Sequence, residues 1–146
     1  MKYLGLLIFS LFVIAGCSDK TFTTDKEDWK ESPTLVKDFV FRIGDNGHLG
    51  FGEYGPFISG ESQKYMWHFW GDEKVLTKPF KVIGIKKETG EKLTVFEFPT
   101  NSVLAPNSGA DHHIPSTMSL PSPGLWKLEA YFGEDLFGNV IVDVKK

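Results

Sequence analysis

The stretch "KYMWHFWG", residues 64–71, most constrains how the chain can fold. Successive side chains of a β-strand point to opposite faces of the sheet. Tyr65, Trp67 and Phe69 would therefore share one face, and the residues that alternate with them would share the other. Both faces carry bulky side chains, so the pattern predicts a central strand.

Further short strands follow from the same kind of alternation, which runs from Pro33 to the end of the chain without a long helical period. Residues 80–85 and 93–98 predict a hairpin that turns at Thr89-Gly90, and residues 124–132 and 140–144 predict a second one. Residues 35–43 and 48–58 add two more strands. Residues 99–124 are rich in Pro, Ser, Asn and Gly and predict a long irregular segment.

About seven strands without crossover helices predict an all-β fold. Two packed antiparallel sheets, in an immunoglobulin-like sandwich, are the simplest way to bury the apolar faces of such strands. A small open β-barrel is the competing topology. The chain is long enough for one such core, so we expect one domain.

The first residues, "MKYLGLLIFSLFVIAGCSDK", have the pattern of an export signal. A lysine precedes an apolar run from Leu4 to Ala15, which is shorter than the roughly 20 residues that a membrane-spanning helix needs. The run ends in Ala15-Gly16-Cys17, which resembles the lipobox of bacterial lipoproteins. We expect residues 1–16 to be removed and Cys17 to carry the lipid, because two acyl chains on one residue anchor a protein stably.

The polar residues that follow the cysteine predict a flexible tether. We expect residues 17–32 to form the anchored cysteine and its tether, and residues 33–146 to form the folded domain. The protein would then lie outside the cytoplasm, attached by lipid to the outer face of the cell membrane.

Cysteine usage and charge exclude several classes of function. Cys17 is the only cysteine, so a lipidated chain has no disulfide, thiolate nucleophile or thiolate metal ligand. Lys2 is the only charged residue in 1–16, so its removal leaves 15 basic and 19 acidic residues, about −4 in net charge. An acidic exterior argues against nucleic acid as a partner.

The last strands carry a family resemblance. "LPSPGLWKLEAYFGEDLFGNVIVDV" resembles the closing strands of bacterial immunoglobulin-like domains. The mature chain, with "IPSTMSLPSPGLWKLEAYF" as its most recognisable part, also resembles a group of small lipoproteins of unknown function from Gram-positive bacteria. The resemblance implies an immunoglobulin-like fold and a place in the cell envelope, and it implies no catalytic residue.

No pattern in the chain predicts an enzyme. "ISGESQK" lacks the last glycine of a nucleophile elbow, and no phosphate-binding glycine motif is present. We therefore expect a non-catalytic protein without a cofactor.

Metal binding is the second hypothesis, and it rests on "SGADHHIPS", residues 108–116. Asp111, His112 and His113 are possible ligands of zinc or copper. Adjacent residues of an extended segment point to opposite sides, however, so the two histidines can share an ion only if the chain turns sharply between them. We favour a structural segment in which Asp111 accepts from the following amides, one histidine is buried and Ile114 points inward.

The first hypothesis is a binding or interaction module for a protein or a cell-envelope ligand. Most of the large aromatic residues are needed for the core. Tyr54, Phe57 and Trp70 lie beside glycines and are the aromatic side chains that we most expect to be exposed as ligand contacts.

Overall fold

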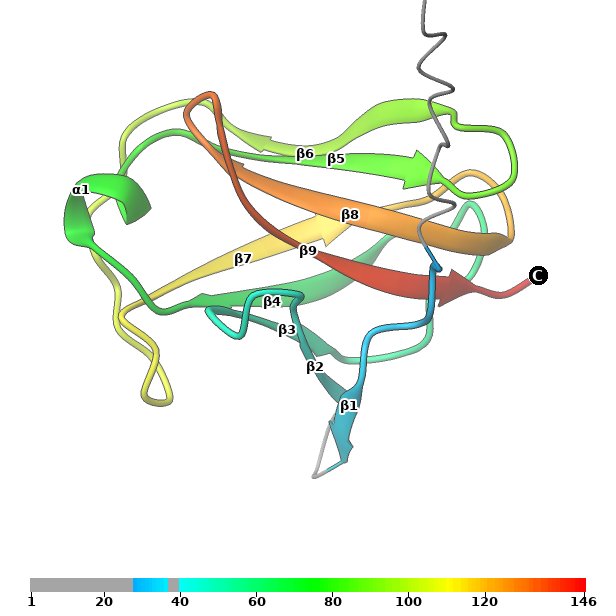
Figure 1. Ribbon diagram of the computed structural model, residues 1–146, viewed down its shortest axis with the longest axis horizontal. Coiled ribbons are helices and arrows are strands. Elements are labelled where there is room, and N and C mark those ends of the chain that lie inside the picture. Colours follow the sequence, from blue (N-terminus) through cyan, green and yellow to red (C-terminus); the bar gives the residue numbers. More distant parts are fainter. Residues whose placement is uncertain (1–27, 37–39) are drawn as a thin grey trace, which may run out of the picture.

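The computed structural model describes residues 28–36 and 40–146. The described residues form nine strands and one short helix (Figure 1). In chain order these are β1 (Thr34–Val36), β2 (Val40–Ile43), β3 (Leu49–Glu53), β4 (Gln63–Phe69), α1 (Glu73–Leu76), β5 (Phe80–Lys86), β6 (Lys92–Phe98), β7 (His112–Met118), β8 (Gly124–Phe132) and β9 (Asp135–Val144).

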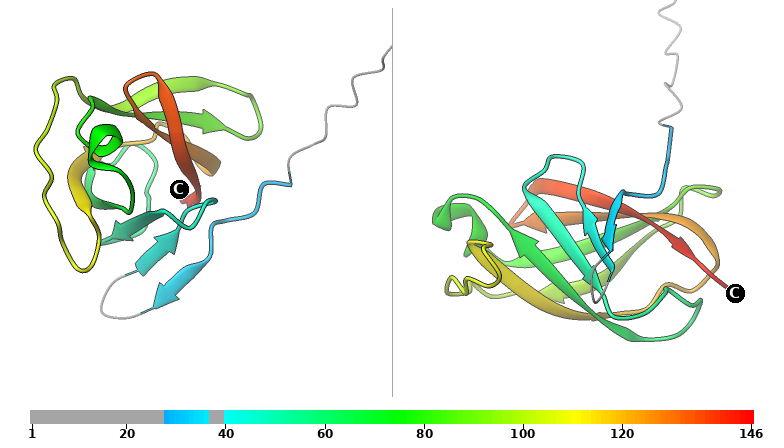
Figure 2. Two further views of the ribbon diagram at one scale, coloured as in Figure 1. Left: turned by 60° about the vertical axis from the view of Figure 1, so that its left-hand side comes forward. Right: turned by 90° about the horizontal axis from the view of Figure 1, so that it is seen from below.

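The strands form two antiparallel sheets that lie one over the other (Figures 1 and 2). One sheet has the order β1-β2-β3-β4-β7 and the other has the order β6-β5-β8-β9. Neither sheet closes on itself, which confirms the predicted all-β two-sheet sandwich and argues against the barrel alternative. The immunoglobulin-like form of the sandwich remains a prediction.

The core lies between the sheets and follows the predicted alternation. Tyr65, Trp67 and Phe69 of β4 point inward and are at most 1% exposed, and β4 lies between β3 and β7, as its two bulky faces predict. Trp126 of β8 is fully buried opposite them. Aromatic rings in contact across the sheets, such as Trp67 and Phe80 at 5.8 Å between centroids, hold this core together.

The segment 35–43 is a hairpin and not one strand. Val36 of β1 pairs with Val40 of β2, so the chain reverses direction between them. The intervening sequence has no glycine or proline, and its alternation continues across the turn. The sequence pattern therefore gave no sign of the reversal.

The long segment 99–124 is also more regular than predicted, because it contains β7. The N–H of His113 donates to Ala105, on the side of β7 away from β4. Pro115 lies two residues further along and has the same backbone orientation, so its missing N–H falls on the outer edge of the sheet. Proline is tolerated in this edge strand for that reason.

Helix α1 was not predicted. Asp72 caps it by accepting from the Lys74 N–H at 2.7 Å, and Pro79 follows its end. A single turn this short has no apolar period that a sequence pattern could reveal.

Residues 28–32 form a strap over the sandwich, although we expected a tether as far as residue 32. The indole of Trp29 lies 4.6 Å from Lys127 Nζ on β8, and Ser32 pairs with Ile141 of β9 through its N–H and its Oγ. Figure 1 shows the strap, in blue, crossing β9 before it reaches β1. The folded unit thus begins at least as early as Trp29.

Candidate functional site

The segment "SGADHHIPS" consists of a tight turn and the first part of β7. Asn107 and Ala110 pair across the turn, with Ser108 and Gly109 at φ values of 52° and 85°. Such positive φ values suit a two-residue hairpin turn. Ile114 is 7% exposed and belongs to the core, as predicted.

Asp111 ties this turn to the end of β4, and its partner differs from the predicted one. Its carboxylate accepts from the Gly71 N–H at 2.9 Å and not from the amides that follow Asp111. The Trp70 indole donates to the Gly109 carbonyl at 2.8 Å, from the same end of β4. The predicted partner was wrong: residues 112 and 113 belong to a strand, and the His113 amide donates to the Ala105 carbonyl instead.

His112 and His113 point to opposite faces of β7, as adjacent residues of a strand must. Their side chains meet at one residue of the preceding segment, which Figure 2 shows running along the side of the molecule from one sheet to the other. The Ala105 N–H donates to His112 Nδ1 at 2.9 Å, and the Ala105 carbonyl lies 2.6 Å from His113 Nδ1. We call this arrangement the Ala105 clamp.

The clamp fixes a different tautomer on each histidine. His112 Nδ1 accepts a proton donor, so its ring proton lies on Nε2, which donates to Ser102 Oγ at 3.3 Å. His113 Nδ1 faces a carbonyl and therefore carries a proton. His112 Nε2 cannot accept the Ser102 proton in this tautomer, so the Ser102–His112 pair is not set up as a nucleophile and its base.

His112 is 2% exposed, which confirms that one histidine of the pair is buried. Burial lowers the pKa of His112, and the nearby charge of His113 lowers it further. A neutral, engaged imidazole inside a sandwich fits a structural role.

The metal hypothesis finds no support in this geometry. The described part of the chain holds no group of three or more His, Cys, Asp or Glu side chains that could bind an ion. Both ring nitrogens of His112 have protein partners, and Asp111 lies on the other side of the turn with Gly71.

The three aromatic candidates have different environments. Tyr54 is 62% exposed, which agrees with the prediction. Phe57 is 3% exposed, so the expectation for this residue was wrong: its ring stacks on Tyr65 at 4.2 Å between centroids and closes one end of the core. Trp70 is half-buried and holds the turn through Gly109.

Tyr54 lies on a groove of about 640 Å³ that the sequence did not reveal. Met66 and Pro115 line it from the outer face of the five-stranded sheet, and Phe96 reaches it from β6. These residues meet through strand register and sheet packing, which no local sequence pattern encodes. The groove is an open apolar feature that contains a predicted ligand contact.

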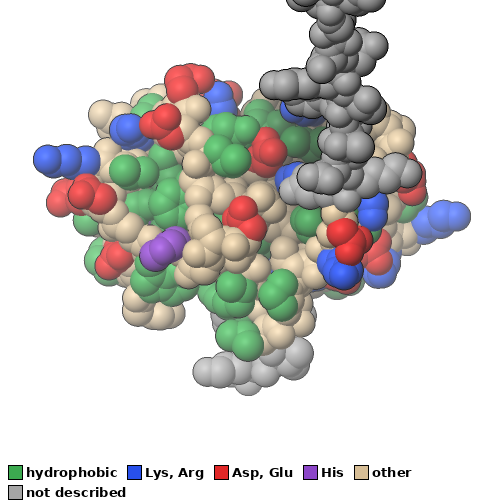
Figure 3. All heavy atoms as spheres, in the orientation of Figure 1, with side chains coloured by type: hydrophobic (Ala, Val, Ile, Leu, Met, Phe, Trp, Pro, Cys, Tyr) green, Lys and Arg blue, Asp and Glu red, His purple; other side chains and the backbone are tan. Residues whose placement is uncertain are grey.

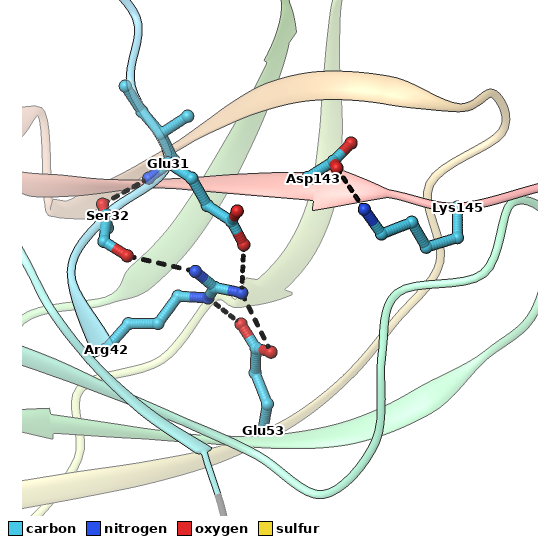
Figure 4. Close-up of polar contacts among 7 residues, drawn as sticks. Glu31, Ser32, Arg42, Glu53, Asp143 and Lys145 are labelled. Atoms are coloured by element: carbon cyan, nitrogen blue, oxygen red, sulfur yellow. Dashed lines mark hydrogen bonds and ion pairs between the residues drawn. The ribbon is translucent and has the colours of Figure 1, made fainter. Parts of the chain in front are cut away.

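A second unpredicted feature is a buried charge cluster beneath the strap (Figure 4). The Arg42 guanidinium binds both carboxylate oxygens of Glu53, and its Nη2 lies 2.6 Å from Glu31 of the strap. Its Nη1 donates to the Ser32 carbonyl at 3.1 Å. Burial raises the pKa of the Glu53 carboxyl, and the Arg42 charge opposes that rise.

The place of Glu53 in the apolar alternation of β3 was a signal in the sequence. Glu53 shares the alternation of Leu49 and Phe51 in β3, so a strand register that buries them also buries the carboxylate. A buried carboxylate requires a partner, and Arg42 on the neighbouring strand supplies it. Elsewhere, charges of both signs are interspersed with hydrophobic side chains over the face that Figure 3 shows.

Comparison with known proteins identifies the family. Residues 21–142 match the family model described as "Domain of unknown function (DUF4871)". The chain belongs to this family. The comparison with curated protein sequences gives no match.

A solved structure shares the fold of this DUF4871 domain. It is the X-ray crystal structure named "a Putative Lipoprotein from Bacillus anthracis", with 23% identity and a TM-score of 0.60. The match covers 81% of this chain and 87% of that chain. It supports the predicted resemblance to lipoproteins of Gram-positive bacteria at the level of the fold.

Two findings concern the membrane. Cys17 and residues 1–16 lie outside the described residues, so the lipidation site stays a prediction. Across residues 28–36 and 40–146, no helix has the length and apolar character needed to cross a membrane.

Proposed function

We propose that this DUF4871 chain is an extracytoplasmic lipoprotein whose β-sandwich is a non-catalytic binding module, held at the membrane by a lipid on Cys17. The lipobox-like Ala15-Gly16-Cys17 is the observation that carries the anchor. The name of the structural neighbour, a lipoprotein from a Gram-positive bacterium, supports it. No nucleic acid is involved.

The binding surface in this proposal is the groove beside Tyr54. Its lining combines an exposed aromatic ring with Met66, Phe96 and Pro115, and Lys64 and Thr117 add polar groups at its margin. Apolar grooves with a few polar groups are the usual form of ligand sites. The ligand would be a protein or a polymer of the cell envelope.

The anchor is tested by Cys17→Ala in the full chain. We expect the variant to leave the membrane fraction or to accumulate as an uncleaved precursor, since it has no thiol to lipidate. Mass spectrometry of the wild-type N-terminal peptide should show the lipid. Unchanged membrane attachment of a lipid-free protein would contradict this part of the proposal.

The binding surface is tested by photo-crosslinking in cells. A benzophenone amino acid at position 54 should give covalent adducts, whereas the same group at Leu136 should not. Leu136 is a matched control because it is 50% exposed and lies on β9, outside the groove. Adducts of equal yield at both positions, or none at position 54, would contradict a ligand in the groove.

A further inference from the structure

Residues 99–106 cover the outer edge of β7, and the Ala105 clamp is what attaches them. The Ala105 carbonyl also accepts from the His113 backbone N–H at 3.0 Å, so it occupies an edge donor of the sheet. Ser102 adds its contact with His112 Nε2 and a hydrogen bond from its N–H to the Thr77 carbonyl at 2.9 Å. Covering an edge in this way blocks pairing with another chain.

The clamp requires an unprotonated Nδ1 on His112. A protonated imidazole has a hydrogen on both nitrogens and cannot accept from the Ala105 N–H. His113 behaves differently, since its Nδ1 already carries a proton and its contact with the Ala105 carbonyl survives a positive charge. Acid therefore breaks the clamp at His112.

One neighbouring imidazole opposes a charge on His112, and a third imidazole opposes a charge on that neighbour. His113 is adjacent in β7, and His68 of β4 is the cross-strand partner of His113. His68 is 6% exposed, and its ring packs edge-on against Phe41 at 5.4 Å because Gly50 leaves room for that ring over the sheet.

Among the described residues, no acidic side chain lines the pocket beside His112 and His113. Phe69 of β4 and the Ser102–Ala105 part of the cover face His112, and Phe41 of β2 and Gly50 of β3 face His68. The carboxylate nearest in sequence, Asp111, is engaged with the Gly71 N–H. Protonation thus adds like charges without a compensating partner.

Detachment of residues 99–106 would uncover an apolar surface. A pocket of about 230 Å³ lies beneath them, lined on the sheet side by Phe98, Ile114 and Pro115. The same movement frees the backbone N–H of His113 at the strand edge.

We propose that residues 99–106 are an acid-released cover of β7, in which protonation of His112 breaks the Ala105 clamp and opens this edge and the apolar pocket beneath it. Above the release pH the cover is closed, and below it the open form is populated. The device is built from the fold and does not depend on which ligand the Tyr54 groove binds.

Amide hydrogen exchange of the full chain in mild detergent tests the cover, with rates corrected for the intrinsic effect of pH. We expect protection of the His113 amide to fall severalfold or more between pH 7.5 and pH 5.0, because the pKa of His112 is lower in the closed form than in the open form. Amides of β8 serve as the internal reference and should lose much less protection than the His113 amide. Equal protection of the His113 amide at both pH values would overturn the proposal.

The variant His112→Asn isolates the sensor. The Asn side-chain oxygen lies near the position of Nδ1, accepts from the Ala105 N–H and does not titrate, so protection at pH 5.0 should match that at pH 7.5. His48→Asn is the matched control, because His48 is exposed in the turn after β2 and should leave the acid response intact. Acid release that persists in His112→Asn would refute the assignment of the sensor.

A second measurement is needed if the cover of the His112→Asn variant is already open at pH 7.5. The imidazole resonances of wild-type His112, followed by NMR against pH, should titrate with the same midpoint as the loss of His113 protection. Two distinct midpoints would overturn the proposal.

Discussion

The guanidinium of Arg42 on β2 binds both carboxylate oxygens of Glu53 on the neighbouring strand β3, inside the sandwich. The side chains are 8% and 5% exposed, so both charges have lost most of their water. Two buried charges are tolerated only as a pair. Tyr65 lies next to this pair, across from Glu53 in β4, and burial followed by the Glu53 charge raises the pKa of its hydroxyl.

Arg42→Met should therefore destabilise the domain by about 3 to 5 kcal/mol, because it leaves the Glu53 carboxylate buried without a partner. Urea unfolding measures this loss. The double variant Arg42→Met, Glu53→Met should recover most of the stability, since no charge stays buried. A single variant as stable as the wild type would show that the pair is not desolvated as described.

Trp67→Ala and Trp126→Ala should each cost about 3 to 5 kcal/mol, the usual effect of emptying a large aromatic site. Both side chains are fully buried, and their indole N–H groups donate to Ser116 Oγ and the Ser122 carbonyl. Tyr54→Ala is the matched control and should change the free energy of unfolding by less than about 0.5 kcal/mol. Thermal and urea unfolding should agree, and an unaltered melting curve for either tryptophan variant would contradict its inward position.

Asp111→Ala should lower the free energy of unfolding by about 0.5 to 1.5 kcal/mol. The carboxylate is exposed, so its bond with the Gly71 N–H is worth an ordinary hydrogen bond and not the larger cost of a stranded buried group. Asp111→Asn keeps an acceptor oxygen and should lose less. Equal losses in the two variants would point to charge in place of hydrogen bonding.

Zinc or copper should leave the melting temperature of the protein unchanged. An ion that binds only the folded state at a hundred times its Kd would add about 2.7 kcal/mol of stability, which a melting curve detects readily. The engaged nitrogens of His112 leave no such site with Asp111 and His113. A large rise in the melting temperature with metal, absent from the double variant His112→Ala, His113→Ala, would reinstate the metal hypothesis.

His68→Leu should make the domain less sensitive to acid. Burial, and then the charge of His113, lowers the pKa of His68 from its ordinary 6.5. Below about pH 6.5 the unfolded chain therefore binds more protons than the folded domain. The contribution of His68 to stability is full above this pH and declines as the pH falls through it. The His68→Leu variant lacks this titrating group, so its stability should fall less as the pH is lowered.

The same variant should also be at least as stable as the wild type at pH 7.5. Nδ1 of His68 is buried and has no hydrogen-bond partner among the described residues, so leucine removes a desolvated polar atom. Urea midpoints at pH 7.5, 6.0 and 5.0 test both statements. A steeper pH dependence in His68→Leu would contradict them.

The strands that the sequence predicted well are those with a clear alternation of side chains or a clear turn signal. Local sequence is enough to form these elements. Examples are the strand with the alternation of Tyr65, Trp67 and Phe69 and the hairpin that turns at Thr89-Gly90. Strand β7 lacked this signature, because it is an edge strand with Pro115 on its outer side. Its register with β4 depends on a distant segment, which alternation alone cannot reveal.

The candidate sites were predicted less well, for a related reason. The opposite orientation of His112 and His113 followed from strand geometry, but their shared partner, Ala105, could not be read from the pattern. Phe57 was misjudged because a glycine and a proline precede it, while its ring packs on Tyr65 from a loop. Contacts between loops and strands depend on the tertiary fold.

The strap gives the domain a defined response to mechanical load. A pull on the chain that precedes residue 28 acts first on Trp29 over Lys127, then on the Glu31 and Ser32 contacts with Arg42 and Ile141. These contacts lie in series along the chain, so a pull separates them one after another. Tension reaches β1 and the sheets only after the strap has come away.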